Sequence, residues 1–244
     1  MGTYTDFYSH VLGRSMGVMA YGHGGVPCLV FPSQDGNCRD FEGFGMLEPC
    51  EPWLGEGRLR LYCVDSLDME TWSAAHLDPA ARMRRHEEWF RHITEEIVPF
   101  IRRDSGWEGR IMTHGCSMGA THAVNALFRR PDVFGSVIAL SGAYDPEWFL
   151  GGYSDALVYL NSPISSVRGM PPGHPYIDML NTCRIVVCCG SGAWEEEMLR
   201  SSRLLEEACR EKGIRAWFDV WGGDVNHDWP WWRTQLHYFL GKVL

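Results

Sequence analysis

A serine flanked by glycines is the clearest candidate for nucleophilic chemistry in this sequence. Residues 115–119 are Gly-Cys-Ser-Met-Gly, so one glycine stands two positions before Ser117 and another stands two positions after it. A buried-strand pattern at 110–113 precedes the motif, and an alanine-rich helical pattern follows it. Small residues at these two positions permit a strained strand-to-helix corner that lifts the serine hydroxyl clear of the backbone. We therefore predict that Ser117 is a catalytic nucleophile rather than part of an ordinary tight turn.

A serine hydroxyl is a poor nucleophile until a neighbouring base accepts its proton. Of the ten histidines, His227 lies in a Gly/Asp/Asn-rich loop between a strand-like run and the last amphipathic helix. His114 and His122 flank the serine motif, where structural roles are expected, and His237 falls within the final helix. We predict that His227 is the base.

An acidic residue should orient the imidazole, and the chain order serine, acid, histidine places it between positions 118 and 226. Glu195 is the first acidic residue after the turn that closes the last long apolar run, and we predict that it is this acid. Glutamates at a helix start are common for dipole reasons alone. Glu196, Asp145 and Asp224 therefore stay open as alternatives.

The oxyanion of a tetrahedral intermediate needs two backbone N–H donors. One is expected from Met118, the residue after the nucleophile. The other is expected from the segment "FPSQDG" after an earlier strand, with Gln34 as the donor and Ser33 or Asp35 as its alternatives.

The elements that must hold these residues can be read from two hydrophobic patterns that alternate along the sequence, one typical of buried strands and one typical of amphipathic helices. Short apolar runs predict buried strands at 27–33, 58–65, 109–115, 136–142 and 183–190. Amphipathic patterns predict helices at 79–103 and 195–212. This alternation predicts an α/β fold with a mostly parallel central sheet flanked by helices, preceded by an antiparallel hairpin. The carboxyl ends of parallel strands share one edge, where the candidate residues would meet.

No repeat, low-complexity tract or linker divides the sequence, so we predict one domain spanning residues 1–244. Residues 145–175 are rich in Gly, Pro and Tyr and predict a cap-like insertion across the rim of the sheet. Trp194 and Trp72 lie on predicted rim loops and are candidates for an aromatic substrate-binding wall.

The composition and charge of the sequence argue against several classes of binding partner. The net charge of -9 argues against nucleic-acid binding, and no run of 18 apolar residues predicts a membrane span. The sequence has neither an H-E-x-x-H motif nor paired Cys/His spacing, so we expect no metal and no cofactor. Nine cysteines without a spaced framework predict reduced thiols, and the amino terminus has no leader pattern, which together predict a cytoplasmic protein. The oligomeric state stays open, a homo-oligomer included.

Four segments together resemble a known family. They are Gly115–Gly119, "RRPDVFGSVIALSGAYD", "CGSGAWEEE" and "HDWPWWR", and they are similar to the esterase family of α/β-hydrolases. That family includes esterase D-type S-formylglutathione hydrolases, feruloyl esterase domains and mycobacterial mycolyltransferases. The resemblance, which covers most of the chain, implies the α/β-hydrolase fold, with Ser117 and His227 as nucleophile and base. It also implies Gln34 and Met118 as the oxyanion donors.

The acid loop departs from the pattern of many members. Ala193 stands where they carry an aspartate, and a glutamate slightly further on, as in the mycolyltransferases, is the closer match.

Taken together, these features predict a serine carboxylic-ester hydrolase that acts through an acyl-enzyme on a small or aromatic acyl ester. Two alternatives stay open: an acyltransferase of the same fold, and a catalytically silent hydrolase-fold binding protein. The motifs do not specify the natural ester or its leaving group.

Overall fold

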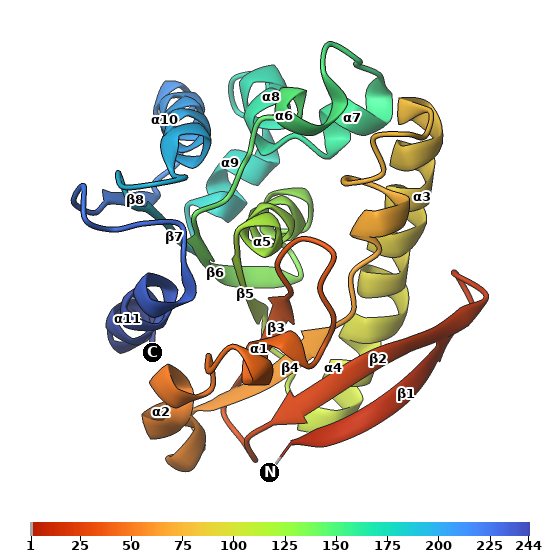
Figure 1. Ribbon diagram of the computed structural model, residues 1–244, viewed down its shortest axis with the longest axis vertical. Helices are drawn as coiled ribbons and strands as arrows, with labels where there is room; N and C mark the ends of the chain where they lie inside the picture. Colours follow the sequence, from red (N-terminus) through yellow and green to blue (C-terminus); the bar gives the residue numbers. More distant parts are fainter. Residues whose placement is uncertain (1) are drawn as a thin grey trace.

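Strands and helices alternate along the chain as the hydrophobic pattern predicts (Figure 1). The computed structural model describes residues 2–244, which form one eight-stranded sheet in the order β1-β2-β4-β3-β5-β6-β7-β8. Its strands are β1 (Thr3–Ser9), β2 (Arg14–Tyr21), β3 (Val26–Phe31), β4 (Leu59–Val64), β5 (Ile111–Cys116), β6 (Phe134–Leu140), β7 (Arg184–Cys189) and β8 (Trp217–Val220). β2 pairs antiparallel with β1 and β4, and the other neighbours are parallel. The α/β fold with a mostly parallel sheet is thus confirmed.

The five predicted buried strands correspond to β3, β4, β5, β6 and β7, with ends that shift by one or two residues. The predicted hairpin is β1–β2, and it joins the sheet through β4 rather than through β3, the next strand in sequence. β5 is buried along its whole length because it lies inside the sheet and is covered on both faces.

Helices cover both faces of the sheet (Figure 1). One face carries α3 (Pro79–Arg91), α4 (Val98–Ser105), α5 (Met118–Arg129) and α10 (Glu196–Glu211), and the other carries α1 (Asp40–Gly43), α2 (Glu51–Gly55) and α11 (Trp229–Val243). Side chains along a strand point alternately into the two hydrophobic cores, one on each face of the sheet. In β3, Leu29 and Phe31 lie in the first core, and Cys28 and Val30 lie in the second. Burial on both faces explains why these strands are apolar throughout.

The helix predicted at 79–103 is interrupted. Asp78 caps α3 by accepting a hydrogen bond from the Ala81 N–H at 2.9 Å, and α3 passes through a π-helical turn, His92–Ile97, into α4. Pro99 has no N–H to donate to the carbonyl four residues earlier, which accounts for the irregular turn just before it.

Residues 145–183, which include the predicted cap-like insertion, contain four short helices: α6 (Glu147–Leu150), α7 (Ala156–Leu160), α8 (Pro163–Gly169) and α9 (Pro175–Leu180). In Figure 1, α6, α7 and α8 lie together at one end of the molecule. There α7 contacts α3, while α8 contacts α5 and α10. Within residues 2–244, no helix has the length and apolar character needed to cross a membrane.

Candidate active site

Ser117 stands at the corner between β5 and α5. Its φ of 56° and ψ of -125° form a backbone conformation that residues other than glycine rarely adopt. The flanking glycines are required by close approach: a Cβ on Gly115 would lie 2.2 Å from the carbonyl carbon of Gly119, and one on Gly119 would lie 2.3 Å from the Phe31 oxygen. The corner therefore has the geometry of a nucleophile elbow.

The structure brings His227 to this corner from a distant part of the chain. His227 Nε2 lies 2.9 Å from Ser117 Oγ, within hydrogen-bond distance. The loop between β8 and α11 that carries His227 is paired with the loop after β7: the His227 N–H donates to the Ala193 carbonyl at 3.0 Å, and the Ala193 N–H donates to Asn226 Oδ1 at 2.8 Å. These bonds fix the imidazole relative to the loop that precedes Glu195.

Glu195 is buried behind His227, with only 1% of its surface exposed. Its Oε2 lies 3.7 Å from His227 Nδ1, and neither atom has a hydrogen-bond partner within the described part of the chain. The separation is longer than a hydrogen bond. Catalytic hydrogen bonds are often long until substrate binds, and here a buried donor and a buried acceptor face each other unpaired.

The three alternative acids lie in other surroundings. Glu196 and Asp224 are exposed, and Asp145 forms an ion pair with Arg200 at 2.7 Å. Of the four candidates, the structure therefore brings Glu195 to the histidine.

Two residues that the sequence reasoning did not assign complete the surroundings of the acid. Ser141 Oγ donates a 2.5 Å hydrogen bond to Glu195 Oε1 and accepts one from Trp232 Nε1 at 3.0 Å. The Trp232 ring also packs edge-on against the His227 ring, with centroids 4.8 Å apart. The available signal for Ser141 was its position at the end of a predicted strand, on the rim where Ser117 also lies.

The loop proposed to supply the second oxyanion donor lies directly against the elbow. It forms a turn closed by the Gly36 N–H, which donates to the Ser33 carbonyl at 2.9 Å, and Ser33 Oγ donates to the Cys116 carbonyl at 3.2 Å. Gln34 is exposed at the top of this turn. Met118 is the first residue of α5, where backbone N–H groups have no partner within the helix.

The two candidate aromatic residues differ sharply in exposure. Trp194 is 80% exposed, with a φ of 67°, and it directly precedes Glu195 on the rim. Trp72 is instead buried, with 3% exposed, because its Nε1 donates to His86 Nδ1 at 3.1 Å and its ring packs in one apolar cluster with Met118. Trp72 thus lies inside the structure rather than on an open wall.

The cysteine beside the candidate nucleophile does not compete with it. Cys116 is buried, and burial raises the pKa of its thiol well above the usual range, so it carries no thiolate near neutral pH. Among residues 2–244, no cluster of three or more His, Cys, Asp or Glu side chains is arranged to hold a metal ion.

The sequence was compared with models of known protein families, and one family matches over most of the chain. Residues 9–242 match the family described as Putative esterase. The chain belongs to this esterase family. No curated protein matches the sequence significantly.

Solved structures share the architecture of this family member at low sequence identity. A ferulic acid esterase superposes with a TM-score of 0.78 at 17% identity, covering 100% of this chain and 97% of its own. An S-formylglutathione hydrolase from Agrobacterium tumefaciens superposes with a TM-score of 0.75 at 19% identity, covering 99% of this chain and 94% of its own. MPT51 (FbpC1) from Mycobacterium tuberculosis superposes with a TM-score of 0.75 at 16% identity, covering 100% of this chain and 98% of its own. These similarities identify the α/β-hydrolase fold.

Proposed function

We propose that this esterase-family protein is a serine carboxylic-ester hydrolase that works through an acyl-enzyme. The observation that carries the proposal is the 2.9 Å contact between Ser117 Oγ, on a strained elbow, and His227 Nε2. In this mechanism His227 takes the hydroxyl proton as Ser117 Oγ bonds to the ester carbonyl carbon, and it then gives that proton to the departing alcohol. Water, deprotonated by the same imidazole, releases the acid and regenerates the hydroxyl.

The other groups of the site stabilise the charges that develop during these steps. Glu195 stabilises the imidazolium and holds the tautomer whose Nε2 faces Ser117. The N–H groups of Met118 and Gln34 stabilise the oxyanion. The exposed ring of Trp194 beside the acid loop supports an aromatic acyl group as one class of substrate, as does the structural similarity to a ferulic acid esterase.

The test is hydrolysis of p-nitrophenyl acetate by the wild type and by Ser117→Ala, with fluorophosphonate labelling located by mass spectrometry. We expect hydrolysis to be lost in the variant and the label to be on Ser117. A folded wild type that neither hydrolyses the ester nor takes the label would contradict the proposal and favour a binding protein. Transfer of the acyl group to an added alcohol in preference to water would favour the acyltransferase.

A further inference from the structure

A buried histidine–carboxylate pair lies behind the loop that carries Gln34. Asp68 follows β4, His122 is on α5, and they are 1% and 3% exposed. His122 Nε2 lies 2.9 Å from Asp68 Oδ1, and because a carboxylate oxygen accepts, Nε2 is the donor. The pair is separate from the set that meets at Ser117.

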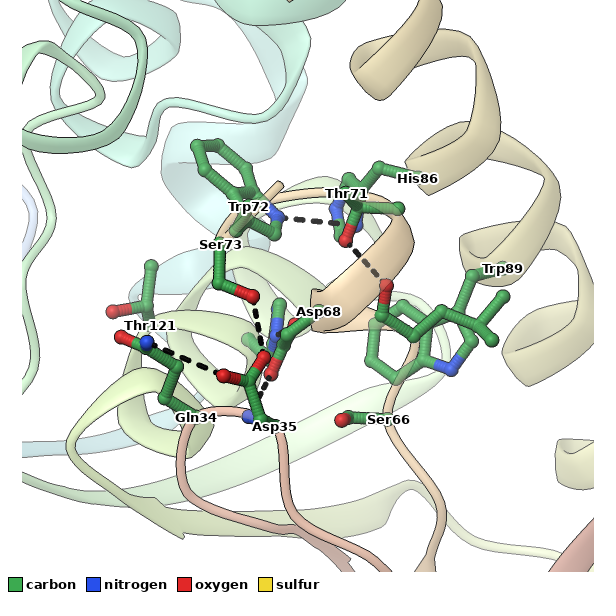
Figure 2. A network of polar contacts seen from close by, with 12 residues as sticks. Gln34, Asp35, Ser66, Asp68, Thr71, Trp72, Ser73, His86, Trp89 and Thr121 are labelled. Carbon is green, nitrogen blue, oxygen red and sulfur yellow. Dashed lines mark hydrogen bonds and ion pairs between the residues drawn. The ribbon is translucent and has the colours of Figure 1, made fainter. Parts of the chain in front are cut away.

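The second oxygen of Asp68 reaches the oxyanion loop itself. Asp68 Oδ2 accepts a 3.3 Å hydrogen bond from the backbone N–H of Asp35, the residue after Gln34. Asp35 has a φ of 60°, a left-handed conformation that is unfavourable for a residue other than glycine unless its surroundings hold it. Ser73 Oγ donates to Asp35 Oδ1 as well, so both the backbone and the side chain of Asp35 are held, as Figure 2 shows.

The far side of the same turn is also fixed. Ser66 Oγ donates to the Gly36 carbonyl at 2.9 Å, and the Gly36 N–H closes the turn onto Ser33. The direction of the Gln34 N–H depends on the backbone torsions of this turn. Asp35 and Gly36, the two residues after Gln34, are anchored to the segment after β4, and Ser33 is anchored to Cys116, so that direction has little freedom.

The connection also joins the two halves of the proposed oxyanion hole. His122 is on α5, whose first residue, Met118, supplies the other N–H donor. The contacts between His122, Asp68 and Asp35 therefore link α5 to the Gln34 loop through side chains rather than through the sheet. An apolar pair could fill the same space, but it could not hold the Asp35 N–H.

His86 does not compete for the Asp68 carboxylate. Its ring stacks on that of His122, with centroids 5.5 Å apart, and its Nδ1 accepts the hydrogen bond of Trp72. Burial and the neighbouring His122 hold the pKa of His86 well below its usual range, so it stays neutral. The donor that meets Asp68 is consequently His122.

We infer that Asp68 and His122 are positioning residues that hold the Gln34 N–H in the orientation needed to stabilise the oxyanion. This inference rests on the proposed serine-hydrolase function. It predicts that loss of the pair weakens stabilisation of the transition state while leaving binding of the ground-state ester nearly unchanged.

The first test is Asp68→Asn, with p-nitrophenyl acetate as substrate and a phenyl trifluoromethyl ketone as the oxyanion-forming inhibitor. Removing an oxyanion donor outright typically costs about a hundredfold to a thousandfold in kcat, so we expect a misdirected donor to cost roughly tenfold to a hundredfold. KM should change by less than about threefold, while the inhibition constant of the ketone should rise by about the same factor as kcat falls. Hydrogen exchange of residues 33–36 should become faster.

The chain supplies a matched control in Glu96. This carboxylate likewise pairs with a buried histidine, His92 at 2.7 Å, and accepts backbone N–H bonds from His10 at 2.8 Å and Val11 at 3.2 Å. Those bonds hold the β1–β2 hairpin rather than the Gln34 loop. Glu96→Gln should lower the unfolding temperature and leave kcat and the ketone affinity at wild-type values.

A rescue experiment separates positioning from packing. His122→Gln keeps an N–H donor that can reach Asp68 and should retain much of kcat, whereas His122→Leu should lose activity as Asp68→Asn does. If Asp68→Asn does not fold, the two His122 variants decide, because they change the partner of Asp68 and keep its carboxylate. Ser73→Ala frees the Asp35 side chain without disturbing the core, and we expect kcat to fall several-fold.

The outcomes distinguish this inference from the proposed function. Wild-type kcat and ketone affinity in Asp68→Asn, or in His122→Leu where Asp68→Asn does not fold, would overturn the positioning role alone. Equal losses in Glu96→Gln would also overturn it. A wild type with neither turnover nor label on Ser117 would overturn both.

Discussion

Ser141 and Glu195 share a 2.5 Å hydrogen bond that leaves the second oxygen of the carboxylate free to face His227. Ser141 Oγ takes one oxygen, Oε1, and Oε2 is the oxygen 3.7 Å from the imidazole Nδ1. Trp232 donates to the same hydroxyl and packs on the His227 ring, so Ser141 links the Glu195 carboxylate to the tryptophan beside His227. The Glu195 carboxylate is thus oriented by Ser141, directly after β6, and through it by Trp232 on α11, as well as by its own loop.

This arrangement predicts graded losses of activity. Glu195→Gln should lower kcat by about a hundredfold or more, because an amide cannot stabilise the imidazolium or hold its tautomer. Ser141→Ala should lower kcat less, by roughly tenfold, because the carboxylate remains but loses one orienting bond. Steady-state hydrolysis of p-nitrophenyl acetate measures both, with Glu196→Gln as the exposed control that should retain activity. A crippled Glu196→Gln beside an active Glu195→Gln would show that the acid is misassigned.

The close approach at the elbow predicts a strong effect of a single methyl group. In Gly119→Ala the new Cβ would lie 2.3 Å from the Phe31 carbonyl oxygen and 2.6 Å from that of Pro32, both backbone atoms that cannot rotate away. We expect the free energy of unfolding to fall by roughly 3 kcal/mol, together with loss of hydrolysis. Gly43→Ala is the control, since nothing lies within 4 Å of its added Cβ. Urea unfolding compares the two, and equal stabilities would contradict the proposed packing of β3 on α5.

Trp194 and Trp72 should respond oppositely to truncation. Trp194→Ala removes an exposed ring, so we expect an unchanged unfolding temperature but a KM for p-nitrophenyl benzoate that rises roughly three- to tenfold, with no change for the acetate. Trp72→Ala removes a buried ring and a hydrogen bond, so the protein should lose roughly 3 kcal/mol or more of stability. If the KM values for the benzoate and the acetate are both unchanged in Trp194→Ala, the Trp194 ring is not part of the substrate site.

The strands, the elbow and the meeting of Ser117 with His227 could be predicted because each depends on local pattern plus one general rule. Apolar runs mark strands buried on both faces, and parallel strands place their carboxyl ends on one edge. Glu195 followed from its place after β7, although only the structure separates it from Glu196, whose side chain is exposed whereas that of Glu195 is buried.

The supporting contacts could not be predicted, because they join loops that are distant in sequence. Ser141 to Glu195, and His122 to Asp68, are contacts between loops or helices after different strands, and no spacing rule specifies such pairs. Trp72 lies on a rim loop as predicted, but the expectation that it lines an open wall was wrong for the same reason: its burial depends on His86 from α3 and on the apolar cluster that includes Leu150 of α6.

The buried His114 predicts a loss of stability in mild acid. Its Nδ1 lies 2.7 Å from the Ile138 carbonyl oxygen on β6, and burial lowers its pKa from 6.5 to about 4. Between these values the unfolded chain binds a proton that the native protein does not, so stability falls as the pH drops from about 7 to about 4 and changes no further below that. The pKa difference corresponds to roughly 3 kcal/mol.

His114→Asn removes this titration and should flatten the pH dependence of stability by that amount. Urea unfolding at pH 7, 6, 5 and 4.5 measures the slope for both proteins. Burial also lowers the pKa values of His86 and His92, but these residues are present in both proteins and their contributions cancel in the comparison. The variant is expected to be less stable than the wild type at pH 7, because it packs less well in β5, and to lose that disadvantage as the pH falls. Parallel curves would mean that His114 takes up its proton equally in the folded and unfolded states, which its burial between β3 and β6 argues against.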